Sequence, residues 1–179
     1  AAYVTGTQTR SYGTLDGAEG YSANDRAETM YVEFCKQADA WLKENPGAEI
    51  SLASMGFSRG AEEAVLLTQL VHERGIQDPD AIEYYTREDG LVDADFIEFD
   101  KTIKPLVEPG KVPQALIAID PVSEGDLKDG GLISAGQPYG VAPSVVGGFQ
   151  ITARDETRRA FIGTEHIEPG LTQDNTRLN

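Results

Sequence analysis

The sequence predicts an α/β fold in which helices flank a mostly parallel sheet. Two short apolar runs, residues 50–55 and 114–119, have the length of buried strands. Two longer stretches, residues 24–43 and 61–71, repeat their apolar positions every three or four residues, as amphipathic helices do. Helices that alternate with strands are typical of parallel sheets with crossover connections. We expect residues 1–179 to form one domain.

The chain opens with a segment that lacks periodicity and continues with a strong helix signal. Residues 1–22 are rich in Gly, Thr, Tyr and Ser and are expected to form a surface loop. The helix over 24–43 is stopped by Asn45-Pro46-Gly47. Cys35 lies on its apolar face, and this position favours a buried core thiol over a reactive one.

A Gly-x-Ser-x-Gly pattern, Gly56-Phe57-Ser58-Arg59-Gly60, joins the first predicted strand to the second helix. At such a junction the serine occupies a sharp turn with positive φ and exposes its hydroxyl as a nucleophile. Side chains at Gly56 or Gly60 are expected to clash with the neighbouring strand or helix. The N–H of Arg59, at the helix start, can face an oxyanion. The pattern alone also describes an ordinary loop of small residues, but its context favours the nucleophile.

Residues 76–113 form a connection that is too long for an ordinary loop. We expect this connection to hold short helices or to act as a lid-like insertion beside the site. It contains the acidic run Asp93, Asp95, Glu98 and Asp100. A calcium-binding loop would need the pattern Asp-x-Asp-x-Asp-Gly, which is absent, so a solvated acidic face is favoured.

A carboxylate follows the second predicted strand directly. The run 114–119 is continuously apolar, as in a central parallel strand, and Asp120 stands at its carboxyl end, where α/β sheets bind ligands. Asp120 also follows the serine in the chain, in agreement with the order Ser, Asp/Glu, His of α/β-hydrolases. We therefore predict Asp120 as the acid of a catalytic triad. An Asx turn before Pro121 is the alternative role.

The remainder carries weaker patterns and two candidate bases. Residues 124–148 are loop-like because of their Gly and Pro content, and residues 151–161 are predicted to form a short helix. A serine nucleophile needs a base. His72 lies about four turns along the helix after the serine and is expected to be structural. His166 follows Asp120 in the required order, although no adjacent glycine presents it as a loop residue.

Composition excludes several classes of function. The net charge of −15 argues against nucleic-acid binding and against electrostatic adsorption to anionic lipid. If the substrate is a lipid, contact with it is expected through apolar surface or through another domain. No apolar run approaches the roughly 20 residues of a membrane span, and no signal peptide is visible. One cysteine and two histidines cannot build a Cys/His cluster, so no metal or cofactor is predicted.

Four segments resemble successive blocks of one family. They are the opening with Gly6-Thr7, the elbow Gly56-Phe57-Ser58-Arg59-Gly60-Ala61, residues 117–122 and residues 153–161. The chain is similar to the α/β-hydrolase domain of bacterial type VI secretion phospholipase and lipase effectors and their uncharacterised relatives. The likeness covers most of the chain, and Gly-Phe-Ser-Arg-Gly-Ala is its most specific motif.

The resemblance implies a serine esterase of the phospholipase or lipase type, with Ser58 as nucleophile and Asp120 as triad acid. One departure concerns Pro121, because the family has Thr-Val after the aspartate. The family's base belongs to a His-x-Asp-x-Gly-Gly-type segment, which is expected just past Asn179. The base is therefore either His166 or a later histidine, and a chain that lacks it is expected to be inactive.

The resemblance also implies that the family's first strand, with an Asp-Gly-Thr turn, precedes Ala1, so the domain is expected to be incomplete at both ends. It implies a bacterial protein that is made in the cytoplasm, is delivered into a target cell and has the secretion apparatus or an immunity protein as partner. Other classes stay open. The chain can be a non-catalytic hydrolase-like module that binds a partner through its loops, or an acyl transferase or peptidase that uses the same serine.

Overall fold

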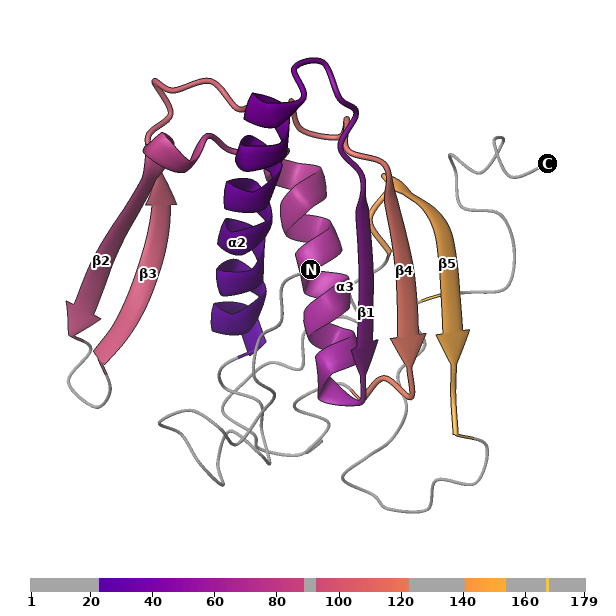
Figure 1. Ribbon diagram of the computed structural model, residues 1–179. Helices are drawn as coiled ribbons and strands as arrows, with labels where there is room; N and C mark the ends of the chain where they lie inside the picture. Colours follow the sequence, from indigo (N-terminus) through magenta and orange to yellow (C-terminus); the bar gives the residue numbers. More distant parts are fainter. Residues whose placement is uncertain (1–22, 89–92, 123–140, 154–166, 168–179) are drawn as a thin grey trace.

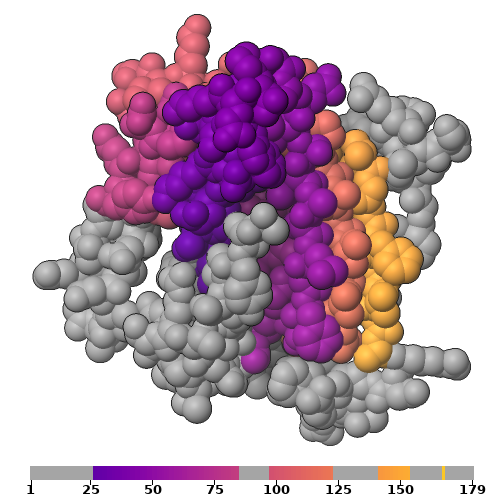
Figure 2. Space-filling view, in the orientation of Figure 1, coloured from indigo at the N-terminus to yellow at the C-terminus, as the bar shows by residue number. Residues whose placement is uncertain are grey.

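The computed structural model describes residues 23–88, 93–122, 141–153 and 167. The elements in chain order are α2 (Ala23–Glu44), β1 (Leu52–Phe57), α3 (Arg59–Arg74), the 3-10 helix η1 (Pro79–Ala81), β2 (Ile82–Glu88), β3 (Asp93–Phe99), β4 (Gln114–Ile119) and β5 (Val145–Ile151) (Figure 1). The helices α2 and α3 lie between a parallel sheet and a separate hairpin. In the space-filling view, the hairpin and the sheet lie on opposite sides of α2 (Figure 2).

The sheet has the strand order β1-β4-β5, and both of its strand pairs are parallel. Leu52 pairs with Gln114, and Phe57 pairs with Ile119, so β1 and β4 end at the same edge. The helix α3 packs against both strands, α2 packs against α3, and both helices lie on one face of the sheet (Figure 1). The predicted parallel sheet with flanking helices is confirmed.

Two apolar cores hold the helices in place. The larger core joins α2 to α3 and contains Tyr31, Cys35 and Val71, all fully buried. The smaller core joins α3 to the sheet through Val65 and Val145. Burying each such side chain contributes roughly 1.5–3 kcal/mol. The predicted core position of Cys35 is confirmed.

The long connection over residues 76–113 forms a β-hairpin, and this hairpin was not predicted. Besides η1, it contains the antiparallel pair β2 and β3, in which Ile82 pairs with Phe99. The Phe99 ring meets the Tyr31 ring edge-on, with 5.7 Å between ring centroids, and this contact ties the hairpin to α2. The expectation of short helices is therefore incomplete, and the role of the segment as a lid stays a prediction.

The third strand of the sheet replaces a predicted loop. Because β5 covers Val145–Ile151, the loop predicted over 124–148 is wrong from Val145 onward. The helix predicted over 151–161 does not begin at Ile151, since that residue ends the strand. Residues 154–161 and the loop expected over 1–22 lie outside the described residues. None of the helices that the structure describes combines the length and apolarity needed to cross a membrane.

Candidate active site

Ser58 occupies the turn between β1 and α3. Its backbone has φ 54° and ψ −128°, so the predicted positive φ is confirmed. Its N–H donates to the carbonyl of Ile119 at 2.8 Å, and its own carbonyl accepts from the N–H of Ala61 at 2.9 Å. A non-glycine residue in such a conformation costs roughly 1–3 kcal/mol. These two hydrogen bonds, together with the packed strand and helix, hold the strained turn.

The two glycines of the motif differ in the space around them. A Cβ added at Gly56 would overlap the carbonyl of Gly60 and lie 2.6 Å from Cα of Ala61, so the clash predicted at Gly56 is confirmed. At Gly60 an added Cβ meets no described atom within 4 Å, so the clash predicted there is wrong. Only Gly56 needs to lack a side chain, because the backbone carbonyl of Gly60 lies where a Cβ of residue 56 would be. The position that a Cβ of residue 60 would occupy is open space.

Asp120 occupies the turn after β4 and has φ 47°. Its N–H donates to the carbonyl of Ile151 at 2.6 Å. Its carboxylate oxygen Oδ1 accepts from the N–H of Ala153 at 3.0 Å. The carboxylate therefore bonds to the segment after β5, and this contact differs from the local Asx turn considered as its alternative role.

The fold brings Ser58 and Asp120 to one edge of the sheet. Each residue directly follows its strand, and the last paired residues of the two strands, Phe57 and Ile119, are partners in the ladder. Among the described residues, Ser58 and Asp120 alone combine a side chain with positive φ. The sheet edge therefore carries two adjacent turns, one with a hydroxyl and one with a carboxylate.

Arg59, the predicted oxyanion donor, is the first residue of α3. The N–H groups in the first turn of a helix have no intrahelical carbonyl to bind, and the helix start carries a partial positive charge. The backbone at Arg59 thus has the chemistry of an anion-binding position beside Ser58.

His72 lies at the opposite edge of the sheet. Its Nδ1 is 3.0 Å from Oγ of Ser144, and that hydroxyl also accepts from Nε2 of Gln114 at 2.7 Å. Gln114 is the first residue of β4, whereas Ser58 follows the last residue of β1. His72 therefore stabilises the amino edge of the sheet, as its predicted structural role requires. His166 lies outside the described residues.

The acidic residues of the long connection give no metal site in the described parts of the chain. No group of three or more His, Cys, Asp or Glu side chains there is arranged to hold a metal ion. Asp100, which was considered for calcium, instead accepts from both the N–H and the hydroxyl of Thr102, at 2.8 and 2.7 Å. These hydrogen bonds lower the pKa of Asp100 because they favour the ionised carboxylate.

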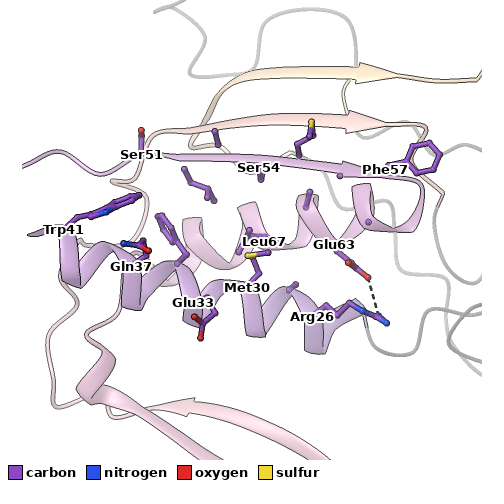
Figure 3. A pocket seen from close by; sticks show the side chains of 18 residues that line it. Arg26, Met30, Glu33, Gln37, Trp41, Ser51, Ser54, Phe57, Glu63 and Leu67 are labelled. Carbon is purple, nitrogen blue, oxygen red and sulfur yellow. Dashed lines mark hydrogen bonds and ion pairs between the residues drawn. The ribbon is translucent and has the colours of Figure 1, made fainter. Parts of the chain in front are cut away.

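Sequence analysis missed a groove that runs along β1. Its volume is about 520 Å³, and it extends between α2 and β1 from Trp41 to Phe57 (Figure 3). At the end near Ser58 its wall includes Arg26, which is 1% exposed and lies 3.4 Å from a carboxylate oxygen of Glu63. No local pattern in the sequence signals this groove, because its lining comes from α2, β1 and α3, which are separate elements of the chain.

Sequence analysis also missed an apolar surface on the sheet face opposite α3. Its most exposed residues are Met55 (70%), Phe57 (66%) and Phe149 (60%). Ile117 and Ile151 belong to the same face and are also exposed. Phe57 directly precedes Ser58 in the chain, and the backbone carbonyl of Ile151 accepts a hydrogen bond from the N–H of Asp120. This apolar surface therefore reaches the candidate site.

Comparison with known proteins identifies no relative. No protein-family model matches the chain, and neither the curated proteins nor the solved structures contain a match. The resemblance to type VI secretion effectors therefore stays a hypothesis that rests on the motifs.

Proposed function

We propose that the protein is a serine carboxylic-ester hydrolase of the α/β-hydrolase type that acts on lipid or phospholipid acyl esters. The observation that carries this proposal is the backbone of Ser58, held at φ 54° in a strand-to-helix turn against a glycine that has no room for a Cβ. Strain of this kind persists only where the surroundings enforce it, and it clusters at active sites. A nucleophile elbow requires this geometry.

The proposed reaction passes through an acyl-enzyme. Oγ of Ser58 attacks the ester carbonyl carbon while a histidine takes the hydroxyl proton. The tetrahedral oxyanion receives a hydrogen bond from the N–H of Arg59. The C–O bond to the alcohol then breaks, and the alcohol leaves with the proton. Water repeats the sequence on the acyl-enzyme and releases the carboxylic acid, while Asp120 keeps the histidine in the required tautomer.

The lipid substrate class has two supports. The first is the motif resemblance to phospholipase and lipase effectors. The second is the apolar surface that includes Phe57, the neighbour of Ser58 in the chain. A chain with net charge −15 gains nothing from ionic adsorption to anionic lipid, so apolar contact is the expected mode of contact with a lipid substrate.

The test is hydrolysis of p-nitrophenyl esters by residues 1–179 and by a version extended beyond both ends. We expect the extended version to hydrolyse the esters and Ser58→Ala to abolish turnover. If residues 1–179 are active and His166→Ala removes the activity, His166 is the base. If only the extended version is active, residues outside 1–179 are required for catalysis, and versions extended at one end alone then show which end supplies them. Folded proteins without activity in either form would contradict the hydrolase and favour a non-catalytic binding module.

A further inference from the structure

The sheet face opposite α3 is apolar at every position of its three strands. Successive residues of a strand point to opposite faces. The nine residues on this face are Ala53, Met55 and Phe57 of β1, Ala115, Ile117 and Ile119 of β4, and Gly147, Phe149 and Ile151 of β5. None of the nine carries a charged side chain, although the chain has a net charge of −15. The helices α2 and α3 lie on the other face, so neither covers these residues (Figure 1).

The register of the strands arranges the nine residues in three rows across the sheet. From the amino edge to the carboxyl edge, the rows are Ala53, Ala115 and Gly147; then Met55, Ile117 and Phe149; then Phe57, Ile119 and Ile151. The first row has only small residues, and a Cβ added at Gly147 meets no described atom within 4 Å. The face is therefore low along its first row and raised along the other two.

The apolar surface has the size of a protein interaction site. Its five most exposed side chains are exposed by between 40% (Ile117) and 70% (Met55). Large apolar side chains at these exposures present on the order of 500 Å² of surface together. A contiguous apolar patch of this size marks a surface that binds a partner. Two such surfaces in contact would remove on the order of 1,000 Å² from water, which is close to the lower limit for a specific interface.

The three rows fit a second copy of the chain in one orientation. Two sheets pack face to face at about 10 Å, and a two-fold axis between them can run along the strands or across them. An axis along the strands sets the two low rows against each other and leaves a void, which loses dispersion contacts. An axis across the strands sets the low row of each copy against Phe57, Ile119 and Ile151 of the other. The middle row then meets itself, and the surface is self-complementary.

We propose that two copies of the chain form a symmetric dimer in which their apolar surfaces pack face to face with the strands antiparallel. The repulsion between two chains of net charge −15 acts outside this uncharged face and is screened over about 8–10 Å at physiological ionic strength. The two Ser58 turns lie at opposite ends of the interface. Lipid and a second copy compete for the same face. The dimer does not depend on the hydrolase activity.

Sedimentation equilibrium of residues 1–179 tests the association. We expect a monomer–dimer equilibrium with a dissociation constant on the order of micromolar, because the interface is small. We also expect tighter association at higher salt concentration, because salt screens the repulsion between the two acidic chains. A protein that stays monomeric at about 100 µM, or a dimer that salt weakens, would overturn the proposal.

A pair of aromatic-to-glutamate substitutions tests the location of the interface. Phe149→Glu places a charge in the middle row, and we expect it to weaken the dimer by about a hundredfold or more. Trp41→Glu is the matched control, because Trp41 is also exposed (44%) but belongs to α2. We expect the control to change the dissociation constant by less than about threefold. Equal effects of the two substitutions would place the interface elsewhere and would overturn the proposal.

A mixture of two variants tests the orientation of the copies. Because the middle row meets itself, residue 149 of one copy faces residue 149 of the other. We expect Phe149→Glu and Phe149→Lys to be monomeric alone, and their equimolar mixture to dimerise to within about tenfold of the parent chain.

Circular dichroism shows first that each variant is folded. If either is not, Met55→Glu and Met55→Lys replace them, since Met55 lies in the same row. Restored association also requires both variants to be folded, so unfolding cannot imitate the expected result. Folded variants whose mixture stays monomeric would overturn the proposal.

Discussion

The backbone N–H of Ser58 donates to the carbonyl of Ile119, the residue that immediately precedes Asp120. This 2.8 Å hydrogen bond joins the two turns at the carboxyl edge of the sheet, and both turns hold their residue at positive φ, 54° at Ser58 and 47° at Asp120. The position of the hydroxyl-bearing residue is thus tied to that of the carboxylate-bearing residue through the β1–β4 ladder. A displacement of either strand would separate them.

The close approach at Gly56 predicts a large asymmetry between the two glycines of the motif. Gly56→Ala forces a Cβ against the backbone of Gly60, and we expect it to lower the free energy of unfolding by about 3 kcal/mol. Gly60→Ala enters open space at the start of a helix and is the matched control, with an expected change below about 1 kcal/mol. Urea denaturation of both variants measures the difference. Equal stability of the two variants would contradict the described turn.

The strain at Ser58 predicts that glycine is favoured there over alanine. Glycine adopts positive φ without steric cost, whereas alanine retains the Cβ of serine. We expect Ser58→Gly to be more stable than Ser58→Ala by about 1–2 kcal/mol, measured by thermal or urea unfolding. At Gln69, which lies within α3, the same pair of substitutions should give the opposite order, because glycine destabilises a helix. A more stable alanine variant at position 58 would show that the turn is not strained.

The proposed role of Asp120 predicts a large effect on activity with a small effect on stability. In Asp120→Asn the side-chain oxygen can still accept from the N–H of Ala153, so stability should change by about 1 kcal/mol or less. The amide cannot hold the histidine in its reactive tautomer, and we expect turnover to fall by about 10³- to 10⁴-fold. Ester hydrolysis by the extended version checks this value. A fall of less than about tenfold would remove Asp120 from the triad.

Two buried groups make stability fall at alkaline pH. Burial raises the pKa of the Tyr31 hydroxyl and that of the neighbouring Cys35 thiol. Both groups stay neutral in the folded protein at pH values at which the unfolded chain ionises, above about 8.5 for Cys and about 10 for Tyr. Their contribution is therefore fully present below these values and is lost as the pH rises. We expect the free energy of unfolding to fall between about pH 8.5 and 11.

Tyr31→Phe isolates the tyrosine part of this effect. At pH 7 the variant loses the 3.1 Å hydrogen bond from the Tyr31 hydroxyl to the carbonyl of Gly75, at an expected cost of about 1–2 kcal/mol. Above about pH 10 its stability should fall less steeply than that of the parent chain. Parallel pH profiles for the two proteins would contradict the assignment.

The sequence was sufficient where a local rule decides the structure. The helix predicted over 24–43 is observed over Ala23–Glu44. Its apolar spacing and the stop signal Asn45-Pro46-Gly47 are both readable from neighbouring residues in the chain. The turn at Ser58 was predictable because a strand, two glycines and a helix follow one another in the chain. The position of Asp120 followed from a continuous apolar strand before it.

The sequence was insufficient where distant contacts decide the structure. The glycines Gly147 and Gly148 weaken the strand signal of β5, yet the strand forms on the edge of β4, and Gly148 leaves space that Ile167 occupies. The hairpin was missed because its strands carry acidic residues on both sides of the alternation, so no apolar face stands out. The groove depends on how α2 and α3 pack beside β1, and no local pattern encodes that packing.

The most direct test of the candidate active site is the reaction of a fluorophosphonate with the folded protein extended beyond both ends, followed by mass spectrometry of its peptides. We predict one adduct, on Oγ of Ser58, that is absent in Ser58→Ala and forms much more slowly in Asp120→Asn. The absence of any adduct, or an adduct on Ser144 beside His72 instead, would contradict the proposal that Ser58 is the nucleophile.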